Sequence, residues 1–311
     1  MKATHSAYFA AVLIGALSSS AAALAVGTQP RAWVSGLGAD AVGCGSLLAP
    51  CRSFQYAHDK IVFAGGTIDV KDAAAYGPII IRNAISIVND GSGTAVILVA
   101  AGGVAIDISA GAADAIHIKG LVIDGVGAGS TGVLGRSFGQ LTIEDCTIKG
   151  FPINGGGAIR LIPSGGTSHF AISHVLLADS YFGVLAQANG GAVITGQVSE
   201  TAIANTDSGV WADAQSGTSS VAVSNTQIEN PHGVGLFATN VNATISADTV
   251  EIDHAEFAVD ALNGGAIYLS NVTVANSTNV DVFTFGGGIV FTYGNNIISA
   301  AAGALTPIAL H

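Results

Sequence analysis

Pairs of aliphatic residues five positions apart recur along most of the chain. The first members of neighbouring pairs lie 22 to 29 residues apart. A repeat of this length is typical of a solenoid, in which each unit buries its apolar face against the next unit. The pairs are Ile118/Ile123, Ile143/Ile148, Ile172/Leu177, Val198/Ile203, Val223/Ile228, Ile245/Val250, Leu269/Val274 and Tyr293/Ile298.

Each repeat also has apolar residues two positions before and three positions after its first anchor. Leu141, Ile143, Cys146 and Ile148 give one example. Period-two spacing that is interrupted once and then resumed predicts two short strands meeting at a tight corner. In this pattern Cys146 occupies a core position, which favours a buried small hydrophobe over a nucleophile.

A third apolar segment follows the corner in each repeat and predicts a third strand. These segments are residues 131–136, 157–162, 182–187, 208–213, 232–237, 257–262 and 280–285. Three short strands per turn, with no helical pattern between them, predict an all-β parallel solenoid whose turns stack at ~4.8 Å.

Polar residues mark the turn between the second and third strands. Asp179, Asn205, Asn230 and Asn276 each lie seven residues after an anchor. Asn and Asp tolerate left-handed backbone angles, so these positions predict a recurring turn.

The third strand is predicted to carry two exposed columns of side chains. We expect Val133, Ile159, Val184, Val210, Val234, Val259 and Val282 to face inward. The first exposed column is then Leu134, Arg160, Leu185, Trp211, Gly235, Asp260 and Phe283. The second is Arg136, Ile162, Gln187, Asp213, Phe237, Leu262 and Phe285. A solvent-facing surface this apolar suggests a binding face.

The chain divides into a leader and one domain. Residues 1–25 have the basic start, apolar run and small-residue end of a secretory signal peptide, with cleavage expected before Val26. Residues 26–311 form a single domain, with a cap region at 26–66, coils at 67–298 and a tail at 299–311. Within the cap region, Phe54, Ala57 and Ile61 share one face of a short amphipathic helix that would cover the open end of the coils.

Export and composition together limit the partners. An exported chain favours a disulfide between Cys44 and Cys51 over two unpaired thiols, and a periplasmic or extracellular location. The formal net charge is −11, and the eleven acidic residues after Arg160 have no Lys or Arg among them. Nucleic acid and anionic lipid are therefore poor partners. No second apolar span follows the leader, so no transmembrane segment is expected.

Residues 57–91, "AHDKIVFAGGTIDVKDAAAYGPIIIRNAISIVNDG", resemble the entry segment of right-handed parallel β-helix proteins of the pectin-lyase-like superfamily. Residues 31–54 and 291–310 look like the two ends of exported proteobacterial members that generally carry no assigned activity. The resemblance implies a right-handed β-helix with a helical cap and a substrate groove on the third strand. It does not imply one activity, because the superfamily includes lyases, hydrolases, esterases, epimerases and adhesins.

Two family activities can be compared with the sequence. Asn205-Thr206-Asp207 is similar to the first acidic motif of polygalacturonases, but an Asp-Asp pair is absent and no Arg or Lys follows position 160. β-Elimination on a uronate needs a base and a positive charge, commonly calcium. In the regular coils only Lys119, Arg136, Lys149 and Arg160 could supply the base.

The exposed columns define our candidate site, which we expect to bind a polysaccharide or cell-surface glycan. Trp211, Phe237, Phe283 and Phe285 offer faces for sugar C–H groups, while Arg136, Arg160, Gln187, Asp213 and Asp260 supply hydrogen bonds. If the face is catalytic, Arg160 is the base candidate, and Asp213 and Asp260, ~9–10 Å apart by strand stacking, are the carboxylate candidates.

Three alternatives remain for this face. It could act as a polysaccharide lyase or glycoside hydrolase, serve as an adhesive or structural surface, or be covered by loops or the C-terminal tail. Calcium is the cofactor that lyase chemistry commonly uses. Glu251, Asp253 and Glu256 are close enough in sequence to suggest a calcium site, although a solvated loop is the simpler interpretation. The histidines form no spaced cluster that would hold a transition metal.

Overall fold

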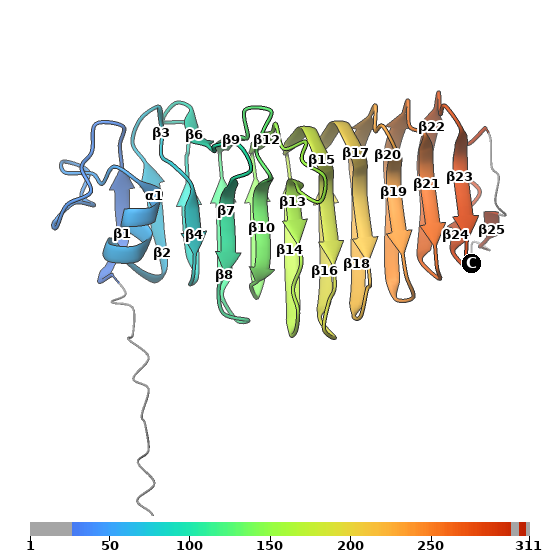
Figure 1. The fold of residues 1–311 in the computed structure, drawn as a ribbon, viewed down its shortest axis with the longest axis horizontal. Coiled ribbons are helices and arrows are strands. Elements are labelled where there is room, and N and C mark those ends of the chain that lie inside the picture. The colour runs from blue at the N-terminus through green and yellow to red at the C-terminus, as the bar shows by residue number, and fades with distance from the viewer. Residues whose placement is uncertain (1–26, 300–304, 309–311) are drawn as a thin grey trace, which may run out of the picture.

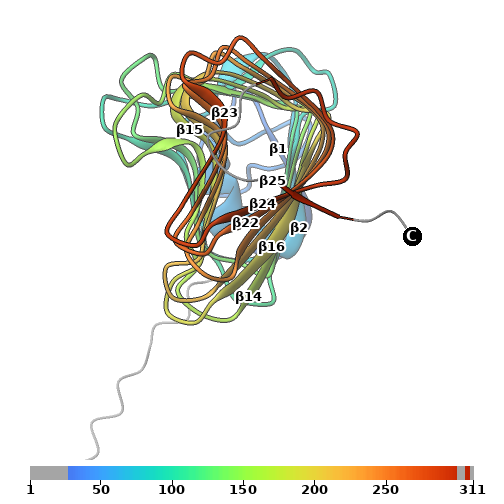
Figure 2. The same cartoon turned by 90° about the vertical axis from the view of Figure 1, so that its right-hand side faces the viewer.

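The computed structural model describes residues 27–299 and 305–308, and the leader predicted at residues 1–25 lies outside them. These residues form a parallel β-solenoid in which the chain winds through three walls (Figure 1). Strands of successive turns lie one behind another in the view along the long axis (Figure 2). All the strand pairings are parallel, so each wall is a continuous ladder of hydrogen bonds.

The first wall contains β1 (Gln29–Val34), β2 (Val62–Val70), β5 (Ile85–Val88), β8 (Ala115–Lys119), β11 (Gln140–Glu144), β14 (Thr167–Ser173), β16 (Val193–Ser199), β24 (Ile289–Thr292) and β25 (Leu305–Pro307). Three long strands belong to the first wall and then turn the corner into the second, and these are β18 (Thr218–Glu229), β20 (Ala243–Asp253) and β22 (Ala266–Ala275).

The second wall also contains β3 (Ala74–Ala75), β6 (Ala95–Leu98), β9 (Leu121–Asp124) and β12 (Thr147–Lys149). Two strands run from the second wall into the third, and these are β15 (Leu176–Gln187) and β17 (Ala202–Asp213). The third wall is completed by β4 (Ile79–Ile81), β7 (Val104–Ser109), β10 (Thr131–Ser137), β13 (Gly157–Leu161), β19 (Val234–Thr239), β21 (Phe257–Leu262) and β23 (Val280–Phe285).

The aliphatic anchors stack in register, which confirms the predicted repeat. Ile143 pairs with Ile172, and Ile172 pairs with Val198. The anchor predicted at Ile245 is wrong, because Val223 pairs with Ala247 and Ile245 pairs with Val221. All four side chains are buried, and the larger Ile245 two positions earlier gives a stronger apolar signal than the small Ala247. The last anchor is also displaced, since Thr292 and not Tyr293 pairs with Leu269.

The corners between the second and third walls have left-handed backbone angles, as predicted. The φ angles of Asp179, Asn205, Asn230 and Asn276 are 49°, 53°, 52° and 52°. Asn205 donates its side-chain amide to Asp179 Oδ1 at 3.1 Å, and Asn230 donates to Asn205 Oδ1 at 2.9 Å. Asn205 is therefore one rung of a side-chain ladder, which accounts for the first residue of the polygalacturonase-like motif.

The N-terminal cap combines a strand, a disulfide loop and a short helix. Cys44 and Cys51 are joined by a disulfide, as predicted. The predicted helix is observed as α1 (Phe54–Tyr56) continued by a π-helical turn at Ala57–Ile61, with Phe54 buried 4.9 Å from the ring of Tyr76. The helix lies at the first end of the stacked coils in Figure 1, where it covers the core.

The other end of the solenoid closes differently. β25 pairs with β24 and so extends the first wall, which means that residues 305–307 do not cover the third wall. Ser299 donates both its backbone N–H and its hydroxyl to Asp281 Oδ2, at 2.7 and 2.8 Å.

In the described ranges, 27–299 and 305–308, no helix combines the length and the hydrophobicity of a membrane span.

Candidate functional site

The outer face of the third wall carries three columns of side chains, one more than predicted. The first column includes Phe182, Ser208, Val234, Phe257 and Val280. The middle column runs Leu134, Arg160, Leu185, Trp211, Phe237, Asp260, Phe283. The third column includes Gln187, Asp213, Thr239, Leu262 and Phe285. The prediction that placed Gly235 in the middle column and Phe237 in the third is wrong, because Leu236 and not Val234 pairs with the inward Val210. The cause is that Gly235, and not Gly233, takes the position of Gly209, so that Gly235 and Leu236 are both buried. A Cβ at Gly235 would lie 2.7 Å from Ile252 Cγ2.

An aromatic cluster forms where the first and middle columns meet. The ring centroids of Phe182 and Trp211 are 5.3 Å apart in an edge-on arrangement, and those of Trp211 and Phe237 are 4.8 Å apart. The Trp211 indole donates its N–H to Thr239 Oγ1 at 2.8 Å, which fixes the ring. A second pair of rings consists of Phe257, on the strand of Asp260, and Phe283, on the next strand of the wall, with ring centroids 5.5 Å apart. Rings held in this way form a preorganised apolar platform.

Asp260 interrupts the aromatic residues. Its strand neighbours in the middle column are Phe237 and Phe283, and only 6% of the residue is exposed. Asp260 Oδ1 is buried and has no hydrogen-bond partner in the described part of the chain. Burial raises the pKa of the carboxyl group to about 6, because water no longer stabilises its charged form.

Asp213 has a different environment, although it was predicted to act beside Asp260. It is 1% exposed, and its two oxygens accept hydrogen bonds from Gln187 Nε2 and Asn240 Nδ2, each at 2.7 Å. These bonds tie together three successive turns. Asp213 is therefore buried, and both of its carboxylate oxygens are engaged by protein side chains and not available to a substrate.

The arginines lie at the far end of the face. Arg160 is separated from Asp260 by four strand steps in one column, or ~19 Å at the usual strand spacing. Burial and the neighbouring Arg136 lower the pKa of Arg160. Arg136 itself pairs with Asp107, at 3.0 Å. The structure therefore does not bring Arg160, Asp213 and Asp260 together.

The apolar surface is smaller than the sequence suggested. Leu134 and Leu185, expected to be exposed, are 4% and 3% exposed and belong to the covered part of the face. Figure 2 shows loops from the blue-green and green turns standing out beside β15. Trp211, Phe237 and Phe283 remain partly exposed, and Phe285 is 68% exposed at the C-terminal end of the wall.

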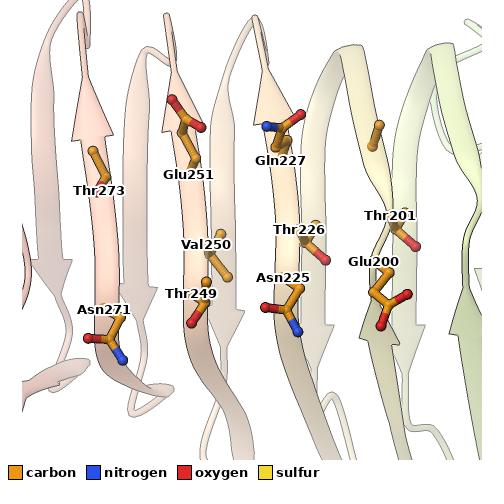
Figure 3. Close-up of a pocket in the computed structure, with 11 residues that line it drawn as sticks. Glu200, Thr201, Asn225, Thr226, Gln227, Thr249, Val250, Glu251, Asn271 and Thr273 are labelled. Atoms are coloured by element: carbon orange, nitrogen blue, oxygen red, sulfur yellow. The ribbon is translucent and has the colours of Figure 1, made fainter.

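A second concave surface was missed by the sequence reasoning. A groove of about 640 Å³ crosses four turns at the corner between the first and second walls. Figure 3 shows its two rows of side chains, one with Glu200, Asn225, Thr249 and Asn271 and the other with Gln227, Glu251 and Thr273. The residues of the first row all have φ between 46° and 55°. In the observed register, two polar residues follow the first anchor of each of these repeats. This pattern is the sequence signal from which the groove could have been predicted.

The acidic residues do not assemble a metal centre. In the part of the chain that the structure describes, no group of three or more His, Cys, Asp or Glu side chains is arranged to hold an ion. Glu251, Asp253 and Glu256 are all at least partly exposed, on the second wall and the loop that follows.

Residues 102–251 match the family model described as "right handed beta helix region". This match, together with the parallel ladders of the three walls, decides the architecture. The chain is a parallel β-helix. No curated protein and no solved structure is significantly similar to it.

Proposed function

We propose that this β-helix protein binds carbohydrate on the outer face of its third wall, without catalysing a reaction there. The observation that carries the proposal is the pair of partly exposed rings of Trp211 and Phe237, supported by the buried Phe182 and next to the buried carboxyl group of Asp260. Aromatic faces pack against the C–H surfaces of sugar rings, and a carboxyl group can exchange hydrogen bonds with ring hydroxyls.

The charge distribution favours a neutral glycan as the ligand. Asp260 and Asp213 are the acidic residues in the middle and third columns of this part of the face, and no Lys or Arg follows Arg160 in the sequence. A polyuronate would meet only negative charge here, whereas a neutral glycan has no such penalty.

Lyase or hydrolase activity is the second candidate, and Asp260 is the observation in its favour. A buried carboxyl group with a raised pKa is a common general acid. Against this candidate, Asp213 has both oxygens bound, and Arg160 lies four turns away.

The disulfide supports an oxidising compartment, which fits the proposed export to the periplasm or the exterior of a bacterium.

The test uses tryptophan fluorescence, because the chain has two tryptophans, Trp33 and Trp211. In a Trp33→Phe background, Trp211 is the reporter, and titration with a panel of neutral and acidic polysaccharides should change its emission for the neutral ones. Phe237→Ala should weaken that binding about tenfold, since one aromatic contact of ~1–1.5 kcal/mol is lost. Equal affinities for the two proteins would refute the proposal.

The catalytic candidate is tested on the same samples. Reducing ends and unsaturated uronates are measured with and without calcium, for the wild-type protein and for Asp260→Asn. Product formation that disappears in Asp260→Asn would replace the binding proposal with an enzymatic one.

A further inference from the structure

The polar groove at the corner of the first and second walls is separate from the aromatic face of the third wall. It is lined by residues of four turns, whose strands pair in sequence from β17 to β22. Each turn contributes one side chain to each row, so polar groups repeat along the long axis at the strand spacing of ~4.8 Å (Figure 3). The groove thus presents a periodic array perpendicular to the strands.

Several groups in this array have free hydrogen-bonding capacity. Asn225, Gln227, Glu251 and Thr273 make no side-chain hydrogen bond or ion pair with any residue that the structure describes. Glu200 contacts His174, and Asn271 donates to Asp248 Oδ1 at 2.9 Å. That bond from Asn271 is the main cause that lowers the pKa of Asp248, so the edge of the groove stays negatively charged.

The lining of the groove carries acidic side chains and no Lys or Arg. Glu200 and Glu251 line it, and Glu229 and Asp253 continue the acidic surface along the second wall. Two histidines lie beside these acids, His174 against Glu200 and His254 against Asp253. The nearest Lys or Arg on the second wall is Lys149, which lies two strand steps before Ala204 and pairs with Asp124 at 3.6 Å. A ligand that matches this surface carries positive charge.

The spacing of the carboxylates distinguishes a polymer from a metal ion. Ala202, two residues after Glu200 in the same turn, pairs with Gln227, and Gln227 pairs with Glu251. The two glutamates therefore lie two turns apart, or ~10 Å along the long axis, and in different rows. One calcium ion needs its oxygen ligands within ~2.6 Å, so these carboxylates cannot share an ion. They can contact separate charges on one extended chain.

The strand pairing distinguishes a glycan from a peptide. A peptide bound in extended form usually adds to a free sheet edge through backbone hydrogen bonds. In this groove β18 pairs with β16, β17 and β20, and β20 pairs with β18 and β22, so no edge is free. What the groove offers is rows of amides, hydroxyls and carboxylates, which suit a polymer that carries hydroxyl and amino groups on every unit.

We propose that this groove binds an amino-sugar polymer, with the glycan chain lying along the long axis of the β-helix and its ammonium groups against Glu200 and Glu251. The site is distinct from the aromatic face and does not depend on the function proposed for that face.

The test is calorimetric titration of the full chain with a six-unit glucosamine oligomer at mildly acidic pH, compared with the N-acetylated oligomer of the same length. The acetylated oligomer has no ammonium groups, so we expect it to bind at least about tenfold more weakly. Glu251→Gln should weaken binding of the charged oligomer by about tenfold, and higher salt should weaken it further. Glu251 is exposed, so this substitution leaves the fold intact.

A matched control variant locates the binding. Glu256→Gln makes the same charge change outside the groove and should leave the affinity unchanged. An equal loss of affinity in Glu256→Gln would mean that only the net charge of the protein matters, and this would overturn the proposal. Polylysine that binds more tightly than the oligomer and is sensitive to Glu251→Gln would also overturn it.

Discussion

At the scale of single residues, Asp260 makes stability depend on pH. Burial raises its pKa from 3.8 to about 6, so the folded protein holds this proton more tightly than the unfolded chain does. The stabilisation is complete below about pH 4 and is lost as the pH rises through about 6. The wild-type free energy of unfolding should therefore fall by about 2–3 kcal/mol relative to Asp260→Asn across this interval.

Urea unfolding followed by circular dichroism from pH 4 to pH 7 measures this difference. Glu256→Gln serves as the matched control, because Glu256 is exposed on the loop before β21. Parallel pH profiles for the wild-type protein and Asp260→Asn would contradict the assignment.

Removing the Asp213 carboxylate should lower the stability of the fold. Asp213→Ala would leave the partly buried side-chain amides of Gln187 and Asn240 without their acceptor. Unsatisfied buried donors cost about 1–3 kcal/mol each, and water reaches these two amides in part, so we expect a loss of about 1–3 kcal/mol in the free energy of unfolding. A loss below about 1 kcal/mol would show that the three turns are not held together through this carboxylate.

At the scale of the element, the stability that the side-chain ladder provides at the corners between the second and third walls has a backbone part and a side-chain part, which substitutions can separate. Asn205→Gly removes two side-chain hydrogen bonds but suits the φ of 53°, whereas Asn205→Ala loses the same bonds and is strained. Asn205→Ala should be about 1 kcal/mol less stable than Asn205→Gly in urea unfolding. Equal stabilities would mean that the backbone angle relaxes without strain.

Strands and corners were predictable from the sequence because period-two patterns and Asn or Asp residues report local geometry. Register was less predictable. Val234 and Leu236 are both apolar and two residues apart, and only stacking on Val210 decides which one faces inward. The site was the least predictable part. The burial of Leu134 and Leu185 and the separation of Arg160 from Asp260 depend on contacts between turns, which no single repeat specifies.

At the scale of the whole molecule, the cysteines provide a test of the packing. Burial raises the pKa of Cys146 to about 12, and Cys44 and Cys51 are joined, so the native protein should show no thiol that reacts with a disulfide reagent. Unfolding without reductant should release one reactive thiol per chain. Three reactive thiols would mean that the cap disulfide is not formed.

The disulfide at the cap also makes the two ends of the solenoid differ in their resistance to mechanical force. In the described part of the chain, a disulfide and a helix close the N-terminal end, while β25 at the other end is held to β24 by a short parallel pairing. Under tension between its ends, the molecule should peel from the C-terminal side, one turn at a time. Each turn of 22 to 29 residues would lengthen the tether by about 70–100 Å, so that a force–extension trace would count the coils.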